Sequence, residues 1–135
     1  MSRRSGWMAV DKNMNVLIVD DYKTMLRIIR NLLKQLGFNN VDEATDGAMA
    51  LQMLRVGNYG LVISDWNMEP MTGLQLLREV RADAKLKPVP FIMVTAESKS
   101  ENVIAAKEAG VSNYIVKPFN AETLKTKMTS VLGDF

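Results

Sequence analysis

Residues 16–21 read Val-Leu-Ile-Val-Asp-Asp, an apolar run of strand length that ends in two carboxylates. The pattern recurs further along the chain: residues 61–65 read Leu-Val-Ile-Ser-Asp, and residues 114–117 read Tyr-Ile-Val-Lys. If these runs are neighbouring parallel strands, their carboxyl ends meet at one edge of a sheet. We therefore expect the three acids and the lysine to converge on one pocket.

The composition is that of one ordinary globular domain. The chain has 135 residues, of which 47% are hydrophobic and 24% charged, and this length can bury a core without disulfides. No apolar stretch approaches the ~18 residues that cross a bilayer, and residues 1–7 are basic without the apolar core of a signal peptide. We expect a cytoplasmic protein with an N-terminal extension over residues 1–13 and one domain over residues 14–135.

Two missing residue types limit the chemistry. The chain has no cysteine and no histidine, which excludes disulfides, thiol nucleophiles, His-ligated or Cys-ligated metals and a Ser-His-Asp triad. The net charge of +2 is too small, and its basic residues too scattered, to indicate nucleic-acid binding. Any chemistry must use carboxylates, hydroxyls, lysines and a hard cation.

Apolar runs of strand length alternate five times with segments of helical period. Several runs are apolar nearly throughout, which indicates strands buried on both faces of a parallel sheet between helices. We expect a doubly wound α/β fold of the flavodoxin-like type, with five strands in the order 2-1-3-4-5 and five helices. Its ligands bind where the winding reverses, between the first and third strands. The predicted strands are residues 16–19, 41–44, 61–65, 91–94 and 114–116.

The ends of the first and third strands carry Asp20, Asp21 and Asp65. Taken alone, Asp20 or Asp21 is equally well explained as a helix N-cap, and Asp65 as a turn residue. Together, three close carboxylates repel one another unless a cation lies between them. An all-oxygen site favours Mg²⁺, with Mn²⁺ as an alternative.

A carboxylate beside such a cation can attack a phosphoryl group and carry it as an acyl phosphate. Lys117 would add a positive charge from the far side, and Thr95, at the end of the fourth strand, could donate a hydrogen bond. Each of these two residues also has an ordinary reading, as a solvated lysine and a strand-terminal threonine. We further predict a cis bond between Lys117 and Pro118.

At this point the sequence resembles a known family, the receiver domains of two-component response regulators, and among them the single-domain chemotaxis receivers of the CheY type. The resemblance covers residues 14 to about 132. The stretches that carry it are VDD (19–21), RNLLKQLGFNNV (30–41), ISDWNM (63–68), MVTAE (93–97), EAG (108–110) and YIVKPF (114–119).

The resemblance implies that Asp65 is the phosphoacceptor. It implies that Mg²⁺ is bound by Asp21, Asp65 and the backbone carbonyl of Asn67, with Asp20 acting largely through water. Thr95 is then a contact of the phosphoryl group.

Further roles are implied around this centre. Lys117 contacts the phosphoryl group, and Thr95 and Tyr114 form a switch in which Tyr114 changes rotamer. Asn67 and Glu97 match positions that influence the lifetime of the acyl phosphate, and Trp66 is a fluorescence reporter.

One stretch departs from the family pattern. Receivers commonly have proline directly after the methionine that corresponds to Met68, whereas this chain has Glu69 and then Pro70. The loop keeps its length, so we expect metal binding to survive and the change to bear on loop conformation and partner access.

The resemblance also implies partners. Because the chain has no histidine, a separate histidine kinase of the CheA type must donate the phosphoryl group. The signal would leave through the face of the fourth helix, fifth strand and fifth helix to a flagellar motor switch protein of the FliM type. A phosphatase is a further candidate partner. We expect a monomer without membrane insertion that phosphorylates and dephosphorylates itself and is not a turnover enzyme.

Three alternatives remain open. The chain could be a phosphate sink that drains the kinase without motor output. It could be a Mg²⁺-dependent phosphohydrolase with an aspartyl-phosphate intermediate. Such enzymes have an Asp-x-Asp motif after the first strand, whereas Asp20 and Asp21 are adjacent. It could also be a docking scaffold, although no candidate site residue is missing.

Overall fold

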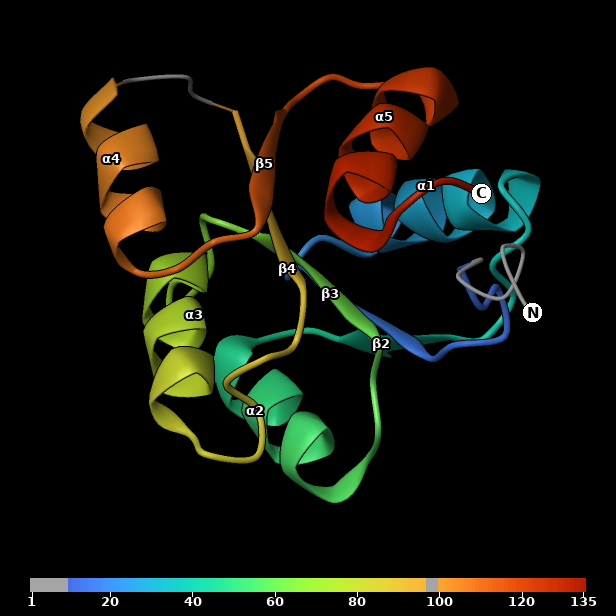
Figure 1. The fold of residues 1–135 in the computed structure, drawn as a ribbon. Coiled ribbons are helices and arrows are strands. Elements are labelled where there is room, and N and C mark those ends of the chain that lie inside the picture. Colours follow the sequence, from blue (N-terminus) through green and yellow to red (C-terminus); the bar gives the residue numbers. More distant parts are fainter. Residues whose placement is uncertain (1–9, 97–99) are drawn as a thin grey trace.

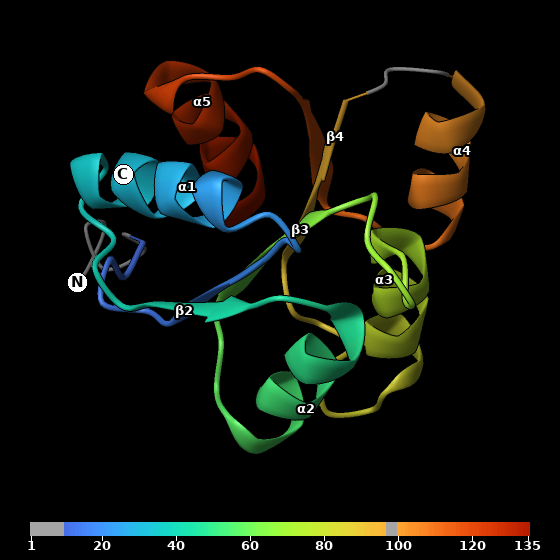
Figure 2. The ribbon, with the colours of Figure 1, turned by 180° about the vertical axis from the view of Figure 1, so that it is seen from behind.

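The computed structural model describes residues 10–96 and 100–135, which form one sheet covered by helices on both faces (Figures 1 and 2). The strands are β1 (Val16–Val19), β2 (Val41–Ala44), β3 (Leu61–Asp65), β4 (Phe91–Thr95) and β5 (Asn113–Val116). The helices are α1 (Lys23–Gln35), α2 (Gly47–Val56), α3 (Gly73–Ala82), α4 (Ser100–Glu108) and α5 (Ala121–Leu132). Strands and helices alternate, as predicted.

The sheet is parallel, and its strand order is β2-β1-β3-β4-β5, which confirms the predicted doubly wound fold. Val19 of β1 pairs with Ser64 of β3, and Asp65 pairs with Val94 of β4. The register therefore brings the residue after β1 level with the last residue of β3. Because the winding reverses between these two strands, their ends border one crevice.

The two faces of the sheet bury separate cores. Helices α1 and α5 cover one face, and α2, α3 and α4 cover the other (Figures 1 and 2). Along β1, Val16 and Ile18 pack on the α1 and α5 side, while Leu17 and Val19 pack on the α2 and α3 side. Every residue of β1, β3 and β4 is buried. Burial on both faces explains why these strands lack hydrophobic alternation.

Helix α1 corrects one detail of the sequence prediction. Spacings of three and four in the sequence predict an apolar stripe of Met25, Ile28, Ile29, Leu32, Leu33 and Leu36. Ile28 in this stripe is 43% exposed, whereas Leu26 outside it is 2% exposed. The helix buries Leu26, Ile29 and Leu33 against the sheet. Spacings of three and four define a stripe only to within about one residue, so packing against β1 decides which side of it is covered.

The first and last of the described residues pack on the same core. Val10 and Phe135 both lie against the core under α1 and α5, and the Lys12 ammonium lies 5.7 Å from the centroid of the Phe135 ring. The boundary between residues 13 and 14 stays a prediction. Within residues 10–96 and 100–135, no helix has the length and apolar character to cross a membrane.

Candidate functional site

Three acids meet at the carboxyl edge of the sheet. Asp20 directly follows β1, Asp21 comes next, and Asp65 ends β3. One carboxylate oxygen from each lies within 4.8 Å of the others. Asp20 and Asp65 are buried, at 1% and 5% exposure, whereas Asp21 is exposed. The structure thus brings together the acids that the strand ends predicted.

Asp20 is only half satisfied. Its Oδ1 accepts a hydrogen bond from the backbone N–H of Tyr22 at 2.9 Å, while its buried Oδ2 has no hydrogen-bond partner in the described part of the chain. The N-cap of α1 is Tyr22, without a side-chain cap. The helix-cap explanation of Asp20 and Asp21 is therefore wrong. Burying a carboxylate oxygen without a hydrogen-bond partner costs folding free energy, which a bound cation would offset.

Burial raises the pKa of Asp20 to about 6 from an ordinary value of 3.8. The hydrogen bond from Tyr22 opposes this rise, and the neighbouring charge of Asp65 adds to it. Lys117 lowers the pKa, and Asp21 raises it, by smaller amounts. In the absence of metal the site therefore holds Asp20 in an environment that disfavours its ionised form.

Lys117 supplies the positive charge of the site. Its Nζ lies 2.8 Å from Asp65 Oδ1 and 3.9 Å from Asp20 Oδ2. The short contact pairs the buried Asp65 Oδ1 with the ammonium, whereas Asp20 Oδ2 lies beyond hydrogen-bond distance of it. The backbone N–H of Lys117 donates to the Thr95 carbonyl at 2.8 Å. The bond between Lys117 and Pro118 is cis, as predicted.

The remaining predicted residues lie around this centre or outside the described residues. Thr95 is buried at the end of β4, and Asn67 lies two residues beyond Asp65 with an exposed side chain. Tyr114 is half-buried on the edge strand β5. Glu97 lies outside the described residues.

A small apolar hollow lies between α4 and the sheet. Its volume is about 10 Å³, which is room for about one water-sized sphere. Its walls come from β3, β4, α4 and β5, and the lining residues are Trp66, Met93, Thr95, Asn102, Val103, Ala106 and Tyr114. The hollow therefore connects Thr95, beside the acids, with Tyr114 on the edge strand.

The loop after Asp65 folds tightly back on it. The Gly73 N–H donates to the Trp66 carbonyl at 2.9 Å, and a methyl group at Gly73 would overlap the Asp65 carbonyl oxygen. Thr72 and Gln75 form a capping box that fixes the start of α3. The bond between Glu69 and Pro70 is cis, which the sequence comparison with the family did not predict. Asp65 is thus held by its strand on one side and by the start of α3 on the other.

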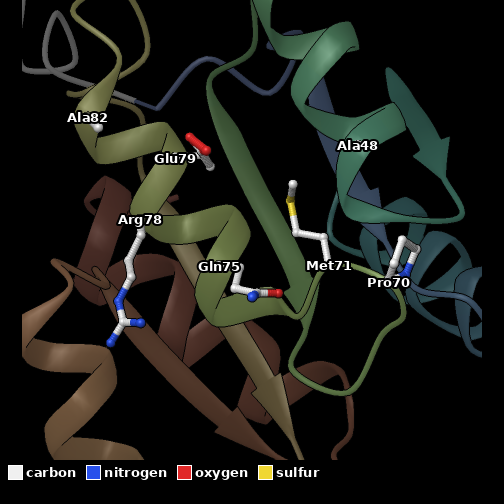
Figure 3. A pocket seen from close by; sticks show the side chains of 7 residues that line it. All are labelled: Ala48, Pro70, Met71, Gln75, Arg78, Glu79 and Ala82. Carbon is white, nitrogen blue, oxygen red and sulfur yellow. The ribbon is translucent and has the colours of Figure 1, made fainter.

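One sizeable cavity lies away from the acids. A groove of about 630 Å³ runs between α2 and α3, and Met71 points into the gap between the two helices while Arg78 points away (Figure 3). Its lining residues are Ala48, Pro70, Met71, Gln75, Arg78, Glu79 and Ala82. This open groove lacks a carboxylate cluster, so the volume of the groove does not make it a candidate site for metal binding or phosphoryl transfer.

Sequence reasoning missed one residue that lies against Tyr114, the predicted switch residue. The Lys127 ammonium lies 5.1 Å from the centroid of the Tyr114 ring. The contact depends on how α5 packs against β5, and no motif or spacing in the sequence carries that information.

The chemistry of the cluster follows from its donors. Carboxylate oxygens are the ligands that Mg²⁺ prefers, and Asp20 Oδ2 is buried without a hydrogen-bond partner in the described residues. The residues present therefore fit a magnesium ion. Asp65 combines this with a neighbouring ammonium, an arrangement suited to receiving an anionic phosphoryl group.

Comparisons with known proteins agree with this geometry. The family model of the response regulator receiver domain matches residues 16–129. The chain is 54% identical over 122 residues to the chemotaxis protein CheY-3 of Vibrio cholerae serotype O1, covering 90% of this chain and 94% of that protein. It is 55% identical over 118 residues to the chemotaxis protein CheY of Pseudomonas aeruginosa, covering 87% and 95%.

A solved structure shares the fold. The receiver domain of a sensor histidine kinase from Pseudomonas aeruginosa PAO1, described with a magnesium ion coordinated in its active-site cleft, is 25% identical with a TM-score of 0.82. The match covers 90% of this chain and 99% of that one. The chain therefore belongs to the response regulator receiver domain family, and within it to the CheY-like chemotaxis response regulators.

Proposed function

We propose that this receiver accepts a phosphoryl group on Asp65 with the help of Mg²⁺ and signals through α4, β5 and α5 to the flagellar motor switch. The observation that carries the proposal is the position of Asp65. Its buried carboxylate lies 2.8 Å from the Lys117 ammonium and shares a 4.8 Å cluster with Asp20 and Asp21. Such a carboxylate is oriented and electrostatically prepared for nucleophilic attack.

The covalent step is a phosphoryl transfer from a phosphohistidine. A carboxylate oxygen of Asp65 attacks phosphorus, an O–P bond forms, and the N–P bond breaks with its electrons leaving on the donor imidazole. Lys117 offsets the charge on the phosphoryl oxygens, and the Thr95 hydroxyl donates to one of them. Hydrolysis of the acyl phosphate returns the carboxylate, so the chain is a self-resetting switch and not a turnover enzyme.

Asp20, Asp21, Asp65 and the Asn67 carbonyl would hold the magnesium ion. When bound, the ion neutralises charge on the phosphoryl oxygens. The buried Asp20 Oδ2, which has no hydrogen-bond partner in the described residues, supports this ligand set, as does the magnesium described for the structurally similar receiver domain. Asn67 and Glu97 would set how long the acyl phosphate lasts.

The partners follow from the family and from the chain's own residues. The chain has no histidine, so a histidine kinase of the CheA type, in the cytoplasm, would be the donor. The exposed apolar side chains Ile104 of α4 and Val116 of β5, at 54% and 36% exposure, support a protein-binding face there for a switch protein of the FliM type. A phosphatase is a further candidate, and the receiver itself, residues 14–135, would act as a monomer.

The phosphoryl group would reach that face through Thr95 and Tyr114. Both residues line the small hollow beneath α4. When Thr95 turns toward the phosphoryl group, the hollow enlarges and the Tyr114 ring can move inward. The phosphoryl group would then shift the populations of two conformations that already exist.

Trp66 fluorescence tests the acceptor. Trp66 directly follows Asp65, so Mg²⁺ followed by a small phosphodonor should quench its emission in two steps. Asp65→Asn should remove the phosphodonor step because the nucleophilic oxygen is lost. Unchanged phosphodonor-dependent quenching in that variant would remove Asp65 from the assigned role. The emission of Trp7 is subtracted with a Trp66→Phe variant.

A binding assay separates motor output from a phosphate sink. A peptide from a FliM-type switch protein should bind the phosphorylated chain more tightly than the unphosphorylated chain. If the phosphorylated chain does not bind the peptide but still dephosphorylates the kinase rapidly, the chain is a phosphate sink.

A further inference from the structure

Lys127 lies against the residue that the proposed switch moves. Its ammonium is 5.1 Å from the centroid of the Tyr114 ring, within the range of a cation–π interaction. Among residues 10–96 and 100–135, Lys127 makes no ion pair with a carboxylate. The Tyr114 ring is therefore the main electrostatic partner of this ammonium in the described structure.

The contact is held by groups other than the two side chains themselves. Asn113, next to Tyr114, donates from Nδ2 to Ser130 Oγ at 2.6 Å, and Ser130 Oγ donates to the Lys127 carbonyl at 2.7 Å. The first bond joins α5 to β5, and the second lies within α5 and ties Ser130 to the turn that carries Lys127. The position of Lys127 over the ring is thus a consequence of how the helix docks on the strand.

The Tyr114 side chain also borders a small hollow. Tyr114 lines the hollow of about 10 Å³ together with Thr95 and Trp66. The ring therefore has two competing environments, the ammonium of Lys127 and the hollow beneath α4. The balance between them sets how often the ring moves inward before any phosphoryl group is present.

We infer that Lys127 is a positioning residue that holds the Tyr114 ring in its resting place and thereby limits spontaneous activation. The inference rests on the proposed switch through Thr95 and Tyr114. A cation–π contact at a half-exposed site should change the ratio of the two ring positions by about two- to fivefold. Loss of the ammonium should therefore raise the inward population without any phosphoryl group.

The test uses three variants of the full chain. Lys127→Met removes the cation and keeps a long apolar side chain, whereas Lys127→Arg retains a cation. Lys125→Met is the matched control, because it removes one charge from the same helix and its ammonium lies 5.4 Å from the Phe135 ring instead of Tyr114. The readout is the nuclear magnetic resonance signal of the Trp66 indole N–H, assigned by loss in Trp66→Phe. Trp66 lines the hollow, and Lys127 is not among its lining residues.

Wild type with Mg²⁺ and beryllium trifluoride, a stable mimic of a phosphoryl group, marks the active position of the signal. Lys127→Met without the mimic should move the signal toward that position by an amount equal to a two- to fivefold change in population. Lys127→Arg and Lys125→Met should leave it in place. In a Tyr114→Ala background, Lys127→Met should have no effect.

The outcomes distinguish this inference from the proposed function. If the mimic moves the wild-type signal but Lys127→Met does not, Lys127 has no positioning role and the switch proposal stands. An equal shift in Lys125→Met, or a shift that persists without Tyr114, assigns the effect to general charge and overturns the inference. If the mimic leaves the wild-type signal unmoved, the switch and the role of Lys127 are both refuted.

Discussion

Helices α1 and α4 begin at the same edge of the sheet but are held very differently. Helix α1 buries Leu26, Ile29 and Leu33, each at 2% exposure or less. Within its described residues, α4 buries Ala106 and leaves Ile104 54% exposed. Helix α1 follows the acids, whereas α4 forms part of the face proposed to bind partners. The acids therefore lie beside a firmly packed helix, whereas the face proposed to bind partners contains a loosely packed helix that can change conformation more easily.

This difference has a physical basis. A site for a small hard cation needs ligands held in place, and the buried ends of β1 and β3 provide this. A surface that changes between two populations needs a small free-energy gap, which few buried contacts provide. The hollow beside Thr95 and Tyr114 lies between the firmly packed strand ends and the loosely packed α4.

The largest effect is expected from truncating α1 in the core. Leu33 is fully buried, so Leu33→Ala should lower the free energy of unfolding by about 2–5 kcal/mol through lost burial and a residual cavity. Urea denaturation followed by circular dichroism measures this. A loss below about 1 kcal/mol would show that α1 is no more firmly held than α4.

A change at the acids should act in the opposite direction. In the metal-free protein at pH 7, Asp20→Asn should raise the free energy of unfolding, because it removes a buried charge with a partnerless oxygen. The pKa of Asp20 near 6, against 3.8 when unperturbed, corresponds to at most about 3 kcal/mol. Denaturation in the presence of a chelator measures it. Destabilisation by Asp20→Asn would mean that the carboxylate is satisfied without a cation.

The same carboxylate predicts a pH dependence. Because the folded state raises the pKa of Asp20, the contribution of this carboxyl to the free energy of unfolding is favourable below about pH 4. That contribution is lost as the pH rises through about 6. The stability difference between Asp20→Asn and wild type should therefore vanish near pH 4 and reach its maximum by about pH 7. The difference between the two proteins cancels carboxylates common to both, including Asp83, whose pKa is lowered. A difference that does not change with pH would contradict the assignment.

Magnesium should stabilise wild type by mass action. At a Mg²⁺ concentration of 100 times its Kd, the free energy of unfolding should rise by about 2.7 kcal/mol. Asp20→Asn should lose most of this gain because one of the three carboxylates that hold the ion, directly or through water, has been removed. Thermal unfolding with and without Mg²⁺ measures both proteins, and Ca²⁺-free buffer with NaCl at matched ionic strength is the control. Equal stabilisation of the two proteins would place the ion elsewhere.

The smallest effect is expected on α4. Ile104→Ala removes the same kind of side chain as Leu33→Ala, but from a position that is 54% exposed. Its effect on unfolding should stay within about 0.5 kcal/mol, while binding of the switch peptide by the phosphorylated chain should weaken. A cost similar to that of Leu33→Ala would remove the contrast between the two helices.

The fold and the meeting of the acids could be predicted from the sequence because both depend on strand ends. Once the apolar runs are strands of one parallel sheet, Asp20, Asp65 and Lys117 must all lie at its carboxyl edge. The family resemblance gave the roles of Thr95, Asn67 and Tyr114, which stay predictions, and Glu97 lies outside the described residues.

Features set by side-chain packing could not be predicted. The exposure of Ile28, the contact of Lys127 with Tyr114 and the hollow beneath α4 depend on how each helix rotates and docks on the sheet. Hydrophobic periodicity gives the face of a helix but not its contacts. The cis bond between Glu69 and Pro70 lies in the stretch where the sequence departs from the family, so the resemblance gave no guide there.

Chemical trapping tests the central claim most directly. The chain is phosphorylated by a small phosphodonor with Mg²⁺ and reduced with borohydride, which converts an aspartyl phosphate to homoserine, and the modified position is then located by tandem mass spectrometry. We predict homoserine at position 65 alone, dependent on Mg²⁺ and absent from Asp65→Asn. Homoserine at position 20 or 21, or at position 65 in equal yield with Mg²⁺ chelated, would contradict the account.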